Sequence, residues 1–293
     1  MIFIIDSGST KCDWIAIDTE TGDLLFEKQR TKGLNPAIIS DTDAFNIIKA
    51  NDIIYDNKLN VTHVYFYGAG CGTEKPSQML KEVLESIFLN AEVVVEEDTY
   101  AAIYATVGVS HRPAVVCILG TGSNCTYFDG VQVDQRVCSL GYSIMDDASG
   151  NYYGRQLLRD YYFNVMPHDL KLVFETRYDV NEDTIKKALY KKPNPNAYLA
   201  TFAEFLILNK ESEYAQNVIK QGLRAFVETM ILQYKEEIKT VPVHFAGSIA
   251  FFTQEEIKSV AQEYGFTVGN FERRPIEGLV NYHAEIAKSS SLS

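Results

Sequence analysis

Two short turns rich in Gly, Ser and Thr constrain the fold of this chain more than any other feature. The first turn reads Asp6-Ser7-Gly8-Ser9-Thr10-Lys11, and the second reads Gly120-Thr121-Gly122-Ser123-Asn124. Each follows an apolar stretch and leads directly into another, so each predicts a tight strand–turn–strand unit. A turn of this composition presents backbone N–H groups and hydroxyls to one point, which suits an oligophosphate.

The segments around the two turns repeat one order of elements. In each half, three strands form a meander, and helices then alternate with further strands. The first half has predicted strands at residues 2–6, 12–18, 24–29, 61–67 and 92–95, and the second half at 114–119, 125–128, 131–137, 243–246 and 266–268. We therefore predict an α/β fold whose architecture is duplicated without obvious sequence identity.

The point at which this pattern restarts predicts the domain boundaries. Residues 1–112 form the N-terminal lobe, which the C-terminal helix 275–293 completes, and residues 113–274 form the C-terminal lobe. The second lobe includes a mostly helical insertion between about residues 150 and 237. A length of 293 residues is consistent with two domains.

Charge and composition exclude several classes of function. The formal net charge is −12, and a protein that binds extended nucleic acid needs clustered Lys and Arg instead. No apolar run approaches the length of about 18 residues that spans a membrane. The five cysteines are scattered without a C-x-x-C pair, which indicates free thiols in a reducing compartment. We expect a cytoplasmic protein with neither a nucleic-acid nor a membrane partner.

Asp6 lies at the end of the first predicted strand. Its carboxylate could hold Mg²⁺, mostly through water, beside phosphate groups. An ordinary hairpin turn would also place Asp, Ser and Gly there. The second turn favours the phosphate hypothesis, because five consecutive small or hydroxyl residues are a poor two-residue hairpin loop.

Asp98 follows the strand predicted at 92–95. It could simply cap the next helix. A carboxylate at the carboxyl end of a parallel strand also faces the crevice where α/β proteins bind ligands. That is the position required of a general base that takes a proton from a sugar hydroxyl.

Two weaker motifs follow later in the chain. The loop 141–150 is rich in acidic and small residues, and it could supply capping acids to a helix or acceptors to a polyol. Gly247-Ser248 follows a strand and could receive the flat face of an adenine, although a Gly-Ser pair is also common in plain turns.

Four of these segments together carry a resemblance to a known family. The motifs are D-S-G-S-T-K, E-E-D-T-Y-A-A-I-Y-A, L-G-T-G-S-N-C and G-Y-S-I-M-D-D-A-S-G-N-Y-Y-G-R. In this order they resemble the N-acetylglucosamine kinase-like proteins of the BadF/BadG/BcrA/BcrD ATPase family, in the actin/hexokinase superfamily. The resemblance covers nearly the whole chain and is most specific over residues 118–125 and 139–155. This chain has Ser7 and Ser9 where the family usually has glycine.

The resemblance implies two ribonuclease-H-like lobes with ATP and Mg²⁺ in a cleft between them, and it assigns site residues by position. The ATP-phosphate ligands would be Asp6, Gly8, Ser9, Thr10, Lys11, Gly120, Thr121 and Gly122, with Asp6 also serving the metal. Asp98 would be the catalytic base, and Gly247 and Ser248 would face adenine. The sugar ligands would be Asn35, Ser123, Asn124, Gly141, Tyr142 and Asp146.

The expected function is ATP-dependent phosphorylation of an amino sugar, with N-acetylglucosamine as the leading candidate. A homodimer would be usual for the family. One alternative is an ATPase activator of a dehydratase-type system, which would bridge an Fe–S cluster with closely placed cysteines that this chain lacks. Another is a sugar or nucleotide sensor without catalytic activity.

Overall fold

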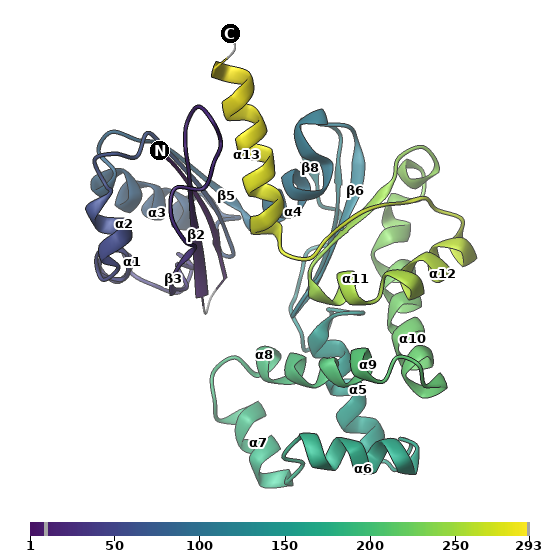
Figure 1. Cartoon of the computed structure of the whole chain (residues 1–293). Helices are drawn as coiled ribbons and strands as arrows, with labels where there is room; N and C mark the ends of the chain where they lie inside the picture. The colour runs from purple at the N-terminus through teal and green to yellow at the C-terminus, as the bar shows by residue number, and fades with distance from the viewer. Residues whose placement is uncertain (9–10, 292–293) are drawn as a thin grey trace. The chain divides into compact units, whose positions relative to one another are not determined.

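The computed structural model describes residues 1–8 and 11–291, and the chain divides into two compact units. Unit 1 contains Met1–His111 together with the C-terminal segment from Arg274, and unit 2 contains Arg112–Arg273 (Figure 1). Each unit has a five-stranded mixed sheet with helices packed against it. The predicted α/β fold is confirmed. In the part of the chain described here, no helix has both the length and the apolar character needed to cross a membrane.

The sheet of unit 1 has the strand order β3-β2-β1-β4-β5. Strand β1 pairs antiparallel with β2 and parallel with β4, and the outer pairs continue these directions. The five strands are β1 (Ile2–Ser7), β2 (Lys11–Ile17), β3 (Gln29–Lys32), β4 (His63–Gly68) and β5 (Glu92–Glu97).

Helices cover both faces of this sheet. On one face lie α1 (Asp41–Lys49), α2 (Asp52–Asp56) and α3 (Glu74–Ile87), and on the other lie α4 (Asp98–Val107) and α13 (Pro275–Ser291) (Figure 1). Alternate residues of β1 therefore enter two different cores, Phe3 and Ile5 on the first face and Ile2 and Ile4 on the second. This double burial explains why β1 is an almost continuous apolar run.

Unit 2 repeats the same topology. Its strand order is β8-β7-β6-β9-β10, with antiparallel β6–β7 and β7–β8 pairs and parallel β6–β9 and β9–β10 pairs. The strands are β6 (Ala114–Leu119), β7 (Ser123–Phe128), β8 (Val133–Asp134), β9 (Val243–Ala246) and β10 (Val268–Glu272). Because β6 corresponds to β1 in both order and direction, the predicted duplication of architecture is confirmed.

A run of helices separates β8 from β9 in unit 2. They are α5 (Gly150–Tyr162), α6 (His168–Arg177), α7 (Glu182–Tyr190), α8 (Pro195–Ala200), α9 (Glu204–Leu208) and α10 (Glu213–Thr229), and α11 (Ser248–Phe252) and α12 (Gln254–Tyr264) follow β9. Within the unit, α6 and α7 lie at the end farthest from the sheet (Figure 1). Phe174 of α6 packs against Phe202 and Phe205, with ring centroids 5.8 and 5.0 Å apart.

Three predicted strands differ from the structure. The strand predicted at 131–137 is shorter, as β8 covers only Val133–Asp134, and the strand predicted at 266–268 lies later, as β10 covers Val268–Glu272. The strand predicted at 24–29 is wrong, because Leu24 makes only an isolated bridge to Ile17 and the third strand is β3. The register of β3 is fixed by Arg30, whose Nε donates to Asp13 Oδ1 at 2.6 Å. At the end of the predicted helical insertion, the α-helix stops at Thr229, and short 3₁₀ turns at Ile231–Tyr234 and Glu237–Lys239 continue its buried side.

Two buried histidines make the stability of both units dependent on pH. His244 of β9 accepts the N–H of Asn270 on Nδ1 at 2.7 Å, and burial lowers its pKa to about 4. His283 of α13 lies 2.9 Å from the Tyr67 hydroxyl, and burial lowers its pKa to about 3. Each side chain is therefore neutral in the folded protein, but in the unfolded chain it takes up a proton below about pH 6.5.

We expect the free energy of unfolding to fall as the pH is lowered, because protons then bind the unfolded chain preferentially. For His244 alone the loss between pH 7 and pH 5 should be about 2 kcal/mol, from the shift of its pKa to about 4. Urea unfolding of the wild type and of His244→Asn at both pH values measures the contribution of His244 to this loss. Asn can accept the same N–H but does not titrate. An equal loss in both proteins would contradict the prediction.

Candidate functional site

The carboxyl ends of β1, β4 and β5 meet at one edge of the unit 1 sheet and bring two candidate carboxylates together. Asp6 pairs in register with Tyr67, and Asp98 follows directly after β5. Burial, together with the negative charges of Asp98 and Asp13, raises the pKa of Asp6 to about 6, and the positive charge of Lys11 opposes this shift. Because β1, β4 and β5 are neighbouring parallel strands, Asp6 near the end of β1 and Asp98 just after β5 belong to the same edge of the sheet.

Asp98 starts helix α4. Its side chain reaches the surface, yet the surrounding protein raises its pKa, and the backbone N–H of Thr99 opposes that shift by donating to the carboxylate. A carboxylate in the first turn of a helix is also stabilised by the helix dipole. The N-cap of α4 is Glu97, so Asp98 is not the cap but an exposed carboxylate in the first turn of the helix.

Asn35 lies at the same edge. The backbone N–H of Leu34 donates to Ser7 Oγ at 2.8 Å, which ties the loop containing Asn35 to the end of β1. The Asn35 side chain is 8% exposed, and its Oδ1 accepts the N–H of Ala37 at 3.0 Å. It packs so closely on Gly70 that a Cβ there would overlap Oδ1. The Ser7 hydroxyl thus has a structural role at the end of β1.

The first turn is described only in part. Gly8 donates its N–H to the carbonyl of Lys11 at 3.0 Å, which closes the hairpin between β1 and β2. The predicted phosphate ligands Ser9 and Thr10 lie outside the described residues.

The second turn has a distinctive set of backbone contacts. Its closing bond runs from the N–H of Gly120 to the carbonyl of Gly122 at 2.9 Å. The start of α5 donates to the other two carbonyls, Gly150 to Gly120 at 2.8 Å and Asn151 to Thr121 at 3.0 Å. Among the described residues, the N–H groups of Thr121 and Gly122 have no protein acceptor. Two neighbouring unpaired N–H groups in a Gly-rich turn can bind an anion.

Gly247 packs its backbone against this second turn. It has φ 111° and ψ 163°, a conformation open essentially to glycine alone, and a Cβ there would overlap the carbonyl of Leu119. Ser248 is the first residue of α11. The structure therefore brings the candidate adenine residues next to the candidate phosphate residues of unit 2.

Asp146 joins the candidate sugar residues to the second turn. Its Oδ1 accepts the N–H of Ser123 at 3.3 Å, and its backbone adopts φ 71°. Asn124 Oδ1 accepts the N–H of Cys125 at 2.9 Å. The other two candidates lie earlier in the same loop, where Gly141 has φ 83° and the carbonyl of Tyr142 accepts from Arg155 at 2.9 Å. No hydrogen bond within the described chain links Gly141 or Tyr142 to the second turn.

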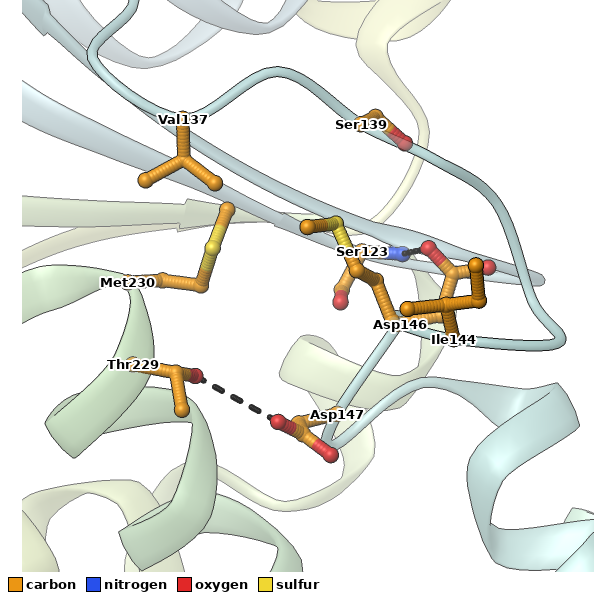
Figure 2. A pocket seen from close by; sticks show the side chains of 9 residues that line it. Ser123, Val137, Ser139, Ile144, Asp146, Asp147, Thr229 and Met230 are labelled. Atoms are coloured by element: carbon orange, nitrogen blue, oxygen red, sulfur yellow. Dashed lines mark hydrogen bonds between the residues drawn. The ribbon is translucent and has the colours of Figure 1, made fainter.

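A pocket of about 240 Å³ opens beside Ser123 and Asp146 (Figure 2). Across it, Val137 and Met230 face one another, and Thr229 donates to Asp147 at 3.3 Å (Figure 2). The lining residues are Ser123, Val137, Ser139, Ile144, Met145, Asp146, Asp147, Thr229 and Met230. Val137, Thr229 and Met230 could not be predicted as site residues, because no sequence motif connects the end of α10 with this loop.

The side chains of unit 1 could bind Mg²⁺ only together with phosphate oxygens from a bound nucleotide. Over residues 1–8 and 11–291, no three His, Cys, Asp or Glu side chains gather closely enough to hold a metal ion. Mg²⁺ is usually held by one or two carboxylates together with phosphate oxygens and water, so the single Asp6 carboxylate suffices. A cation beside Asp6 would also relieve its repulsion from Asp98.

One solved structure decides the family. It is a putative N-acetylglucosamine kinase from Porphyromonas gingivalis that shares 32% sequence identity with this chain, with 97% of this chain and 99% of that chain covered and a TM-score of 0.89. The chain belongs to this family of N-acetylglucosamine kinase-like proteins. No protein-family model matches the chain, and no curated protein sequence matches it.

More distant structures share only the fold of this N-acetylglucosamine kinase-like protein. A ROK family glucokinase from Streptomyces griseus, in complex with glucose and AMPPNP, is 15% identical, with 99% and 98% of the two chains covered and a TM-score of 0.57. A ROK family transcriptional regulator, a homolog of the E. coli MLC protein, is 12% identical, with 98% and 79% covered and a TM-score of 0.63. The fold prediction of an actin/hexokinase-like architecture is thereby confirmed.

We expect Gly247→Ala to lower the free energy of unfolding by at least about 2 kcal/mol, through both backbone strain and overlap with Leu119. Gly265→Ala is the matched control, because Gly265 also has a positive φ, 74°, but open space around its Cβ position. Its loss should be closer to about 1 kcal/mol. Urea titration of both variants measures the difference, and equal losses would show that Gly247 does not pack as described.

Proposed function

We propose that this chain catalyses ATP-dependent phosphorylation of an amino sugar, with N-acetylglucosamine as the preferred substrate. The observation that carries the proposal is the second turn, where the N–H groups of Thr121 and Gly122 have no acceptor among the described residues. Such groups suit the β- and γ-phosphates of ATP. Membership of an N-acetylglucosamine kinase-like family supports the same function.

The phosphate and metal roles follow from charge. Gly120, Thr121 and Gly122 would bind phosphate oxygens, and Gly8 and Lys11 of the first turn would add to them. Mg²⁺ bound by Asp6 would neutralise the charge that develops on the transferred phosphoryl group. Gly247 and Ser248 would receive the adenine, since a bare backbone permits close approach of a flat ring.

Asp98 would act as the general base. It would accept the proton of a sugar hydroxyl as that oxygen bonds to the γ-phosphorus, while the bond from the γ-phosphorus to the β–γ bridging oxygen breaks and ADP leaves. The surrounding protein raises the pKa of Asp98, which brings the carboxylate closer to the operating pH that suits a general base. Most of the rate would come from positioning and charge stabilisation.

The pocket beside Ser123 and Asp146 supports an N-acylated sugar. An N-acyl group carries an N–H donor, a carbonyl acceptor and an apolar end. Asp147 can accept the N–H, and the Ser139 hydroxyl can donate to the carbonyl. Val137 and Met230 can pack against the apolar end. The remaining sugar contacts would come from Asn35, Asn124, Gly141 and Tyr142.

A non-catalytic sensor is the second candidate, because a transcriptional regulator has the same fold. The position of Asp98 at the edge shared with Asp6 favours the enzyme. The activator ATPase is less well supported, since Cys12, Cys71, Cys117 and Cys125 are buried.

We expect Asp98→Asn to lower kcat by about 10² to 10⁴, because the amide cannot accept the hydroxyl proton. ADP affinity should stay within about twofold of wild type, since the role proposed for Asp98 is toward the sugar hydroxyl and not toward the phosphates. A coupled assay of ADP release and calorimetry of ADP binding measure the two effects. Asp129→Asn, which removes an exposed carboxylate from the β7–β8 turn, is the control for charge loss. Unchanged turnover in Asp98→Asn would sink the assignment of the base.

We expect Met230→Ala to widen the pocket for the acyl group. The ratio of kcat/KM for N-butanoylglucosamine to that for N-acetylglucosamine should rise by about tenfold, the scale of one or two methylenes in an apolar pocket. KM for ATP should not change. Met79→Ala in α3 of unit 1 is the control. A ratio that stays constant would place the acyl group elsewhere.

A further inference from the structure

Asn151 is a buried residue at the start of α5 that the motif analysis left without a role. It is 1% exposed. Its backbone N–H and its side-chain Nδ2 both donate to the carbonyl of Thr121, at 3.0 and 2.7 Å. The same Nδ2 donates to Asp146 Oδ2 at 2.8 Å. One amide group therefore holds two parts of the candidate site.

The planarity of the peptide bond gives this contact a consequence for the second turn. In a trans peptide the C=O of one residue points opposite to the N–H of the next. Gly150 fixes the carbonyl of Gly120 and so aims the N–H of Thr121 away from α5. Asn151 fixes the carbonyl of Thr121 with two donors and so aims the N–H of Gly122 away from α5. Within the second turn, these are the two N–H groups that have no protein acceptor among the described residues.

Asn151 also closes a loop of hydrogen bonds around the turn. Its Nδ2 holds Asp146 Oδ2, and Asp146 Oδ1 in turn accepts the N–H of Ser123. The turn is thereby anchored in its middle, at Thr121, and at its end, at Ser123. A Cβ on Gly122 would press against Asp146 Oδ2, so the carboxylate lies directly on the turn.

The amide of Asn151 is not optimal for stability alone. Its Oδ1 is buried and, in the described part of the chain, has no hydrogen-bond partner. A buried acceptor without a partner destabilises the folded protein, because it has lost its hydrogen bonds to water. Asn151 is nevertheless the residue at this position, and its Nδ2 orients both Thr121 and Asp146.

We propose that Asn151 is a positioning residue of the phosphate site, which acts by aiming the N–H of Gly122 at a phosphate group. The proposal rests on the proposed function only in that the second turn binds nucleotide phosphates. It does not depend on which sugar is phosphorylated, or on whether any sugar is.

The test compares ADP with adenosine, which has no phosphate. Asn151→Asp keeps the shape but replaces the Nδ2 donor by a carboxylate oxygen beside Thr121 and Asp146. We expect calorimetry to show at least about a tenfold loss of ADP affinity and no change in adenosine affinity, since one lost charge-assisted hydrogen bond is worth about that much. Asn151→Ala, which removes the donor without adding charge, should show a smaller loss with the same selectivity for ADP.

Asn209→Ala is the matched control. Asn209 also belongs to unit 2, and its Nδ2 donates to the carbonyl of Phe205 at 2.8 Å, away from the second turn. It should lose stability and keep its ADP affinity. Equal losses of ADP and adenosine affinity in Asn151→Ala, or no loss in a folded variant, would overturn the proposal. A wild type that binds ADP but phosphorylates no sugar would overturn the proposed function and leave this inference standing. A wild type that does not bind ADP would overturn both.

Discussion

The central strand of each unit is buried on both faces, and the rest of each unit depends on this burial. Strands β1 and β6 have partners on both edges and are almost fully buried along their length, so neither can carry a polar side chain until it leaves the core. Polar groups therefore collect where these strands end. For this reason Asp6 lies at the edge of the unit 1 sheet where β1 ends, and the polar second turn lies where β6 ends in unit 2.

The parts of the fold that could be predicted are those in which one local pattern decides the structure. The apolar runs of β1, β6 and β9 predict buried strands because few other elements tolerate such runs. Helix α6 has no clear helical pattern in the sequence because its apolar residues lie on two sides, with Leu170 and Phe174 buried but Leu172 exposed. The third strand was misplaced because tertiary pairing between Asp13 and Arg30, not the apolar pair at Leu24, fixes its register.

The candidate site also contains features that the sequence predicts and features that it does not. The density of small residues in each turn, and a carboxylate at the end of β5, are visible in sequence because each is a local feature. The pocket is not, since Thr229 and Met230 reach it from the end of α10. No local pattern in the sequence predicts a role for Asn151. Its contact with Thr121 depends on how α5 packs against the β6–β7 turn. Contacts between segments far apart in sequence have no local signature.

The chain order of unit 1 has a consequence for biosynthesis. Ile2, Ile4, Ile15 and Ile17 form one face of its sheet, and α13 covers that face with Ile276 and Leu279. The ribosome makes α13 only after all of unit 2. Until then the first unit to be synthesised keeps an open apolar face, whereas unit 2 is contiguous in sequence and can complete its core first. The first half of this protein to emerge is thus the last to become complete.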